Sequence, residues 1–310
     1  MKGMELSKAY FENYGRPMIE KQLSQYAPYI AAGLVGEGSE CLGFDDELSQ
    51  DHDFGPAFCL FVPQKIYNEA GALMQSLYDQ LPQSFMGYQR INTPQAAGRI
   101  GVVPIEAFYM KYTGLEHAPK DNMQWFRIPE SFLSTATNGE VFMDNLGEFT
   151  QIRNSLKAFY PEDVLKKKLA ARCAKMAQAG QYNYPRSMKR NDCQAAYFAC
   201  SEFVKTAMSA VYLLNGEYMP YYKWIFRGAE GFVHLKESVA KLKQLTQTPD
   251  TAQYAEYKTD LIENICIEIG RELNRRGYTK TTDPFLQLHG EELMRSIKDY
   301  RLSQLHIMVD

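Results

Sequence analysis

The sequence predicts an α+β protein, with a small mixed-sheet domain at residues 1–137 followed by an all-helical domain at residues 138–310. In the first part, short apolar runs that stop at Gly or Pro alternate with helically spaced segments, which is typical of strands mixed with helices. Beyond residue 142 the apolar positions recur with helical spacing throughout. The chain has 310 residues and is 45% hydrophobic, so it can bury two cores.

The first domain is predicted to begin with a helix at residues 5–27 that is interrupted near Gly15-Arg16-Pro17. Apolar runs predict strands at residues 30–36, 57–63, 85–91 and 98–103. A helix is predicted at residues 64–81, between the second and third of these strands. Pro104 is suited to open another helix at its first position, because it has no amide hydrogen to leave unpaired.

The second domain is predicted to contain long helices at residues 161–179, 192–214, 251–276 and 284–306. The helix at 192–214 carries apolar residues at i, i+3, i+4 and i+7, so one of its faces should be buried. Gly270, inside the third helix, indicates close helix packing. We interpret the basic run Lys166-Lys167-Lys168 as a solvated helix face.

Composition excludes several classes of protein. The net charge of −3 provides no broad positive surface for nucleic acid or membrane. The N-terminal segment lacks the apolar core of a signal peptide, and no stretch approaches the roughly 20 apolar residues that span a bilayer. The six cysteines contain no C-x-x-C pair, which argues against a zinc site or a disulfide framework. We therefore expect a cytoplasmic protein with no membrane partner.

Residues 36–56 carry the pattern that points to chemistry. A predicted strand ends in the turn Gly36-x-Gly38-Ser39, where residues without a Cβ let backbone amides approach an anion. After an acidic spacer comes Asp51-His52-Asp53. In a strand, Asp51 and Asp53 would face the same side while His52 points away. Two converging carboxylates suit a Mg²⁺ ion that also binds substrate phosphates.

A strand, a Gly-Ser turn, a short spacer and Asp-x-Asp together resemble the signature of the polymerase-β-like nucleotidyltransferase superfamily. The chain also resembles the domain of unknown function 4037 family, through Ser49 to Pro56 and through residues 139–153, 159–164 and 219–224. This likeness runs over roughly residues 30–230. It implies that Gly38 and Ser39 bind the triphosphate of an NTP, most simply ATP, and that Asp51 and Asp53 hold Mg²⁺.

Superfamily members usually place a third carboxylate on a later strand. The run GRIGVV at 98–103 contains no acid, and Glu106 is the candidate that follows it. Glu106 has a second interpretation, because an acid in a first helical turn also favours the helix dipole. These two interpretations of Glu106 leave open a non-catalytic nucleotide-binding or regulatory module.

Cations in the helical domain are candidates for binding the triphosphate. Arg186 and Arg190 precede a long helix, and Lys223 lies in an aromatic segment between two others. Such groups can bind phosphates, while a neighbouring aromatic ring stacks on the base. The alternative is that their stems cover apolar surface while their charged ends stay in water.

The acidic segment is also compatible with a solvated surface turn. It does not fit a calcium-binding EF-hand loop, because Gln50 and Pro56 stand where that loop requires Gly and Glu. A histidine-aspartate metal phosphohydrolase would need additional histidine ligands, and the remaining histidines form no metal-spaced pair.

The predicted function is Mg²⁺-dependent transfer of an NMP group from an NTP to a hydroxyl of a small-molecule acceptor. The helical domain would select the acceptor. A transferase that modifies a protein or tRNA is the alternative with the same chemistry. Nucleic acid is the less expected partner, because the chain lacks a broad basic surface.

Overall fold

The computed structural model describes residues 1–50, 54–90 and 99–310. Contacts divide the chain into two units, one formed by Met1–Pro119 with Phe132–Ala158 and the other by Lys120–Ser131 with Phe159–Asp310. The chain therefore crosses between the units at 119/120, 131/132 and 158/159. This division differs from the predicted single boundary at 137/138.

A four-stranded mixed sheet forms the centre of the first unit, with strand order β5-β2-β1-β6. Its strands are β1 (Ala31–Leu34), β2 (Cys59–Val62), β5 (Gly101–Pro104) and β6 (Glu140–Asp144). β1 runs antiparallel to β2 and β6, whereas β5 is parallel to β2. The mixed sheet followed by a helical unit confirms the predicted α+β class. The prediction that the chain is helical throughout after residue 138 is wrong at β6.

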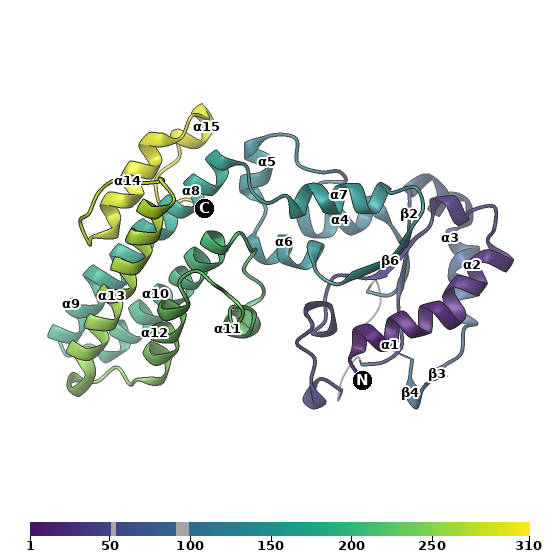
Figure 1. The fold of residues 1–310 in the computed structure, drawn as a ribbon, viewed down its shortest axis with the longest axis horizontal. Coiled ribbons are helices and arrows are strands. Elements are labelled where there is room, and N and C mark those ends of the chain that lie inside the picture. The colour runs from purple at the N-terminus through teal and green to yellow at the C-terminus, as the bar shows by residue number, and fades with distance from the viewer. Residues whose placement is uncertain (51–53, 91–98) are drawn as a thin grey trace. The chain divides into compact units, whose positions relative to one another are not determined.

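Helices cover both faces of this sheet (Figure 1). The helices assigned wholly to the first unit are α1 (Gly3–Tyr10), α2 (Arg16–Gln22), α3 (Gln64–Asp79), α4 (Ile105–Thr113) and α7 (Glu148–Lys157). Phe58 and Leu60 point to one face and share a buried cluster with residues of α1, α2 and α3. Phe61 points to the other face, where its ring stacks 4.1 Å from Phe149 of α7 and lies 5.1 Å from Phe108 of α4.

Two local features refine the predicted elements. The interruption in the first helix is a π-helical turn at Phe11–Gly15, between α1 and α2. The predicted strand at 85–91 is instead a short hairpin of β3 (Ser84–Phe85) and β4 (Tyr88–Gln89). Met86 and Gly87 between them have φ of 51° and 87°, as a type I′ turn requires.

The second unit is built from helices packed around α8 (Glu162–Met176) and α10 (Cys193–Asn215). Its other helices are α5 (Asn122–Arg127), α9 (Tyr184–Lys189), α11 (Ile225–Gly228), α12 (Lys236–Gln247), α13 (Ala255–Arg275), α14 (Leu286–Ser296) and α15 (Tyr300–Ser303), while α6 (Glu130–Thr137) spans the boundary at 131/132. A Cβ added to Gly270 would lie 2.8 Å from Nε2 of His289. The close packing predicted at Gly270 is therefore confirmed.

The lysine run on α8 does not form a solvated face. Lys167 and Lys168 are 0% and 2% exposed, and Lys166 is buried beside Glu162, with its Nζ 2.7 Å from Oε1 of that residue. Neighbouring helices cover α8 on more than one side, since α14, α10 and α5 all pack against it. The sequence interpretation is wrong because composition does not reveal this burial.

In the described parts of the chain, all six cysteines are free, which agrees with the absence of a disulfide framework. No helix in the same residues has the length and apolar character needed to cross a membrane.

Candidate functional site

The glycine turn after β1 has a backbone that only glycine adopts easily. Gly36 and Gly38 have φ of +117° and +123°, in a region that L side chains rarely occupy. A Cβ on Gly38 would also lie 2.4 Å from Oε1 of Glu40. Ser39 follows and begins a short 3₁₀ turn at Glu40–Leu42.

The turn is held in place by residues just ahead of β6. Nδ2 of Asn138 donates to the carbonyl of Gly36 at 2.7 Å, and the Gly36 amide donates back to Oδ1 of Asn138 at 2.8 Å. The amide of Gly139 donates to the carbonyl of Cys41 at 2.7 Å. Arg153 of α7 donates in turn to the carbonyl of Gly139 at 3.0 Å. These bonds fix the turn before any ligand arrives.

Three groups of the turn remain available to a ligand. Within the described residues, no acceptor is bonded to the amide N–H of Gly38 or Ser39, or to the Ser39 hydroxyl. Ser39 is partly exposed. Donors of this kind on a rigid turn suit an anion such as a phosphate group.

Two cations lie beside the turn and meet at Glu37. Nζ of Lys111 is 2.9 Å from Oε1 of Glu37, and Nη2 of Arg99 donates to the Glu37 carbonyl at 3.1 Å. The hydroxyl of Tyr112 also contacts Oε1 of Glu37, at 3.4 Å. Burial lowers the pKa of Lys111, but its hydrogen bonds to Glu37 and Tyr112 and the charges of these groups together outweigh this effect, and the net pKa is raised. Lys111 therefore stays positively charged near neutral pH.

These side chains line a pocket of about 230 Å³, whose polar residues are Glu37, Arg99, Lys111 and Tyr112. The pocket also includes Cys59, whose pKa is raised by burial to about 12, so its thiol is not a ready nucleophile. The arrangement is suited to binding a charged group.

Sequence reasoning missed Arg99 and Lys111. Arg99 comes just before β5. It lies near the turn because β5 pairs in parallel with β2, a contact between segments far apart in sequence. Lys111 comes from α4. No local motif marks either residue; the one available signal was a cation at the start of a predicted strand.

Asp51 and Asp53, the predicted Mg²⁺ ligands, lie outside the described residues. Gly55 and Ala57, which follow them in sequence, line a narrow pocket together with Glu40 and Arg99. This segment therefore returns to the neighbourhood of the turn before β2 begins.

Glu106 has a structural partner in the fold. Its Oε2 accepts a hydrogen bond of 2.9 Å from the amide of Gln64, the first residue of α3. Glu106 thus caps a neighbouring helix, beyond the carboxyl ends of β2 and β5. Among the described residues, no group of three His, Cys, Asp or Glu side chains is placed to hold a metal. The role of Glu106 as a metal ligand stays a prediction.

Arg186, Arg190 and Lys223 belong to the second unit, whereas the glycine turn belongs to the first. All three are exposed. The Arg186 guanidinium lies 4.7 Å from the ring centre of Tyr182, and Nζ of Lys223 lies 4.9 Å from that of Trp224. Their predicted role in phosphate binding stays a prediction.

The second unit also has a pocket of about 650 Å³, between α10, α12 and α13. Its walls include Tyr197, Tyr222 and Val204, and Lys258 and Asp250 also line it. Nζ of Lys258 is 2.5 Å from Oδ1 of Asp250. This volume is typical of sites for small molecules.

The protein is thus of the α+β class, with a glycine turn at the sheet and a helical second unit. Residues 125–225 match the family described as domain of unknown function (DUF4037). The predicted resemblance to this family is confirmed over these residues. The match includes the segments at 139–153, 159–164 and 219–224 but not Ser49 to Pro56.

Among solved structures, the chain is similar to a nucleotidyltransferase-like protein from Exiguobacterium sibiricum. The two share 13% identity with a TM-score of 0.38, and the alignment covers 84% of this chain and 79% of the other. No curated protein matches the chain.

Proposed function

We propose that the protein is a nucleotidyltransferase that transfers an NMP group from NTP·Mg²⁺ to a hydroxyl of a small molecule. The observation that carries the proposal is the fixed glycine turn, with unused donors at Gly38 and Ser39 and with Arg99 and Lys111 beside it. This set of donors and cations suits a polyphosphate. Asp51 and Asp53, which follow the turn along the sequence, would supply the carboxylates that metal-assisted phosphoryl chemistry requires.

In the proposed reaction, the acceptor oxygen attacks the α-phosphorus of the NTP. The new P–O bond forms as the bond from the α-phosphorus to the bridging oxygen of the β-phosphate breaks, and pyrophosphate leaves. The hydroxyl proton passes to a base that we do not assign. The turn amides, with Arg99 and Lys111, would hold the β- and γ-phosphates and stabilise the charge that builds on pyrophosphate.

Mg²⁺ prefers oxygen ligands and keeps substrate phosphates in its shell. Glu37 and Glu40, which line the narrow pocket beside the turn, carry oxygen donors of this kind. Asp51 and Asp53 would hold the ion, which when bound polarises the phosphate oxygens.

A small acceptor is favoured by the net charge of −3, which gives no broad surface for a long polyanion. Incubating the protein with radiolabelled ATP and cell extract, then separating the label by size, compares the acceptors. Label that enters chiefly RNA or protein, and needs Asp51, would support the alternative of a transferase that modifies tRNA or protein.

The main test of the function is mass spectrometry of the products formed with each NTP, Mg²⁺ and a metabolite extract. The expected result is a metabolite whose mass has increased by one NMP group, together with released pyrophosphate. Pyrophosphate release without such a product would instead indicate hydrolysis and would contradict the proposal.

A non-catalytic nucleotide-binding module is the second candidate. It is favoured by the capping role of Glu106 and by the lack of an acid on β5, the strand beside β2. NTP binding with no product from any extract would support this candidate over the transferase.

Replacing Arg99 or Lys111 by Met is expected to weaken NTP binding by roughly tenfold to a hundredfold. Each loss of a charge-assisted hydrogen bond costs about 1.5–3 kcal/mol. Calorimetric titration with a non-hydrolysable NTP measures the change. Lys65→Met, at an exposed lysine of α3 in the same unit, is the matched control and should bind normally. Equal affinities in all variants would remove the two cations from the site.

Replacing Arg186, Arg190 or Lys223 by Ala is expected to lower NTP affinity by a similar factor, about one to two decades for each charge-assisted bond that is lost. The same titration tests this result, with Lys189→Ala on α9 as the control. Unchanged affinity in all three variants would confine the nucleotide site to the first unit.

A further inference from the structure

A row of cations on α8 lies inside the second unit. Lys167, Lys168 and Arg172 are all less than 10% exposed, and the side chain of Lys175 is 28% exposed. Burying a charge is costly unless an opposite charge or a hydrogen-bond partner offsets the loss of water. The groups that pair with these four cations therefore indicate which kind of ligand this part of the second unit could bind.

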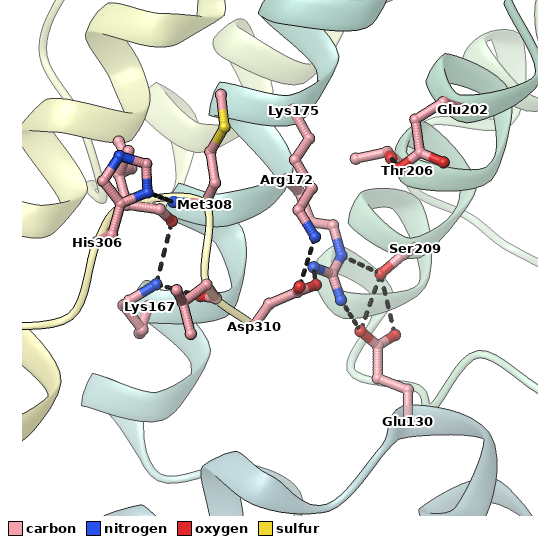
Figure 2. A network of polar contacts seen from close by, with 12 residues as sticks. Glu130, Lys167, Arg172, Lys175, Glu202, Thr206, Ser209, His306, Met308 and Asp310 are labelled. Carbon is pink, nitrogen blue, oxygen red and sulfur yellow. Dashed lines mark hydrogen bonds and ion pairs between the residues drawn. The ribbon is translucent and has the colours of Figure 1, made fainter. Parts of the chain in front are cut away.

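Arg172 is the best-satisfied member of the row. Nε donates to Oγ of Ser209 at 2.6 Å, and Nη2 pairs with Oε1 of Glu130 at 2.6 Å. Oγ of Ser209 in turn donates to the Glu130 carboxylate at 2.9 Å. The remaining amino group, Nη1, pairs with the side chain of Asp310 (Figure 2).

Residues 306–310 provide the other partners. The Asp310 carboxylate bridges Arg172 and Lys175, with 2.5 Å between Nζ of Lys175 and Oδ1. Nζ of Lys167 donates to the carbonyls of Ile307, at 3.1 Å, and Val309. Figure 2 shows this segment lying along α8, with Asp310 pointing at the cations.

The charge of Glu130 acts on Lys168, but no carboxylate in the described part of the chain pairs with it directly. Among the described residues it makes no hydrogen bond or ion pair, and its Nζ lies 5.4 Å and 5.2 Å from the ring centres of Phe126 and Tyr160. The Tyr160 hydroxyl is itself buried with no hydrogen-bond partner among the described residues. Burial lowers the pKa of Lys168 to about 8, so most of it is still charged at neutral pH.

The charges in this group do not balance. Four cations stand against two carboxylates in direct contact with them, Glu130 and Asp310. The nearby Glu202 accepts a hydrogen bond from Thr206, and its charge also acts on Lys175, which still leaves four cations against three carboxylates. A surplus of positive charge, together with two buried donors that lack an acceptor, is unfavourable for a purely structural network. The same surplus would be neutralised by an anion.

We propose that Lys168, Arg172 and Lys175 form a binding site for a phosphate group, and that Asp310 occupies this site as an internal ligand. When residues 306–310 move away, hydrogen-bond donors become available at Nη1 of Arg172 and Nζ of Lys175. Nζ of Lys167 also loses its two carbonyl acceptors and can donate to a ligand. A phosphate dianion has enough acceptor oxygens to use several of these donors and enough charge to match the surplus. The site lies wholly in the second unit and does not depend on the proposed nucleotidyl transfer.

The proposal is tested by titrating the full chain with inorganic phosphate in a calorimeter, at constant ionic strength set with chloride. The wild type is expected to bind weakly, because its own carboxylate competes. Asp310→Ala is expected to bind at least about tenfold more tightly, since the binding-competent fraction rises. Asp310→Asn keeps the size of the side chain and removes its charge, so it should give the same gain if the alanine variant loosens the fold.

A second substitution distinguishes the site from a general effect of charge. Lys168→Met in the Asp310→Ala background should abolish the gain, whereas Lys236→Met, at an exposed lysine of α12, should preserve it. The proposal is overturned if removing the Asp310 charge leaves phosphate affinity unchanged, or if the gain survives Lys168→Met.

Discussion

Replacing Asp51 or Asp53 by Asn is expected to reduce Mg²⁺-dependent nucleotidyl transfer by at least roughly 10²–10³-fold, the scale of losing one electrostatic group from an active site. Asparagine keeps the shape of the side chain but removes the charge that binds the cation. Turnover is followed by the release of pyrophosphate from radiolabelled NTP at saturating Mg²⁺. The fold should be kept, because the substitution changes no volume.

Glu47→Gln is the matched control, since Glu47 is an exposed acid in the same segment and carries no predicted role. It should retain activity. Near wild-type turnover in either aspartate variant, or an equal loss in Glu47→Gln, would place the metal site elsewhere.

Gly139→Ala is expected to destabilise the protein by roughly 2–5 kcal/mol, through backbone strain and steric overlap together. Gly139 has a φ of +67°, and a Cβ there would lie 2.1 Å from the carbonyl oxygen of Leu34 at the end of β1. The backbone would have to separate at the point where β6 begins and where the glycine turn is anchored. Urea unfolding, followed by circular dichroism, measures the free energy of unfolding.

Gly114→Ala separates the two causes. Gly114 ends α4 with a φ of +70°, but an added Cβ would meet no atom within 4 Å. It should lose only the strain of a left-handed residue, about 1–2 kcal/mol. If both substitutions cost the same, the close contact with β1 is not what requires a glycine at position 139.

The sequence predicts β1 and β2 well, because each is a continuous apolar run buried in the middle of a sheet. It does not reveal β6, whose residues are only partly buried and whose alternation is too short to stand out. β6 lies at the edge of the sheet and is defined by pairing with β1, a contact between segments far apart in sequence. Local patterns carry little information about such pairings.

The same limit applies to the candidate site. The turn at Gly36 and Gly38 could be predicted, because its signal is the glycines themselves, which are local in the sequence. The placement of Lys111 against Glu37 could not, since it depends on how α4 packs over the sheet. The burial of Lys168 was missed for a related reason: a lysine in a polar run looks solvated until the helices around it are placed.

The path of the chain between its two units has a consequence for how the protein is made. The first unit is not complete until residue 158, because β6 pairs with β1 and Phe149 of α7 stacks on Phe61. During synthesis, one edge of β1 stays unpaired until β6 has been translated. Residues 120–131, which belong to the other unit, are translated in between. An open edge strand is a site for aggregation. A nascent chain that exposes this edge is therefore expected to persist until about 40 further residues have been translated, at ~5–20 residues per second.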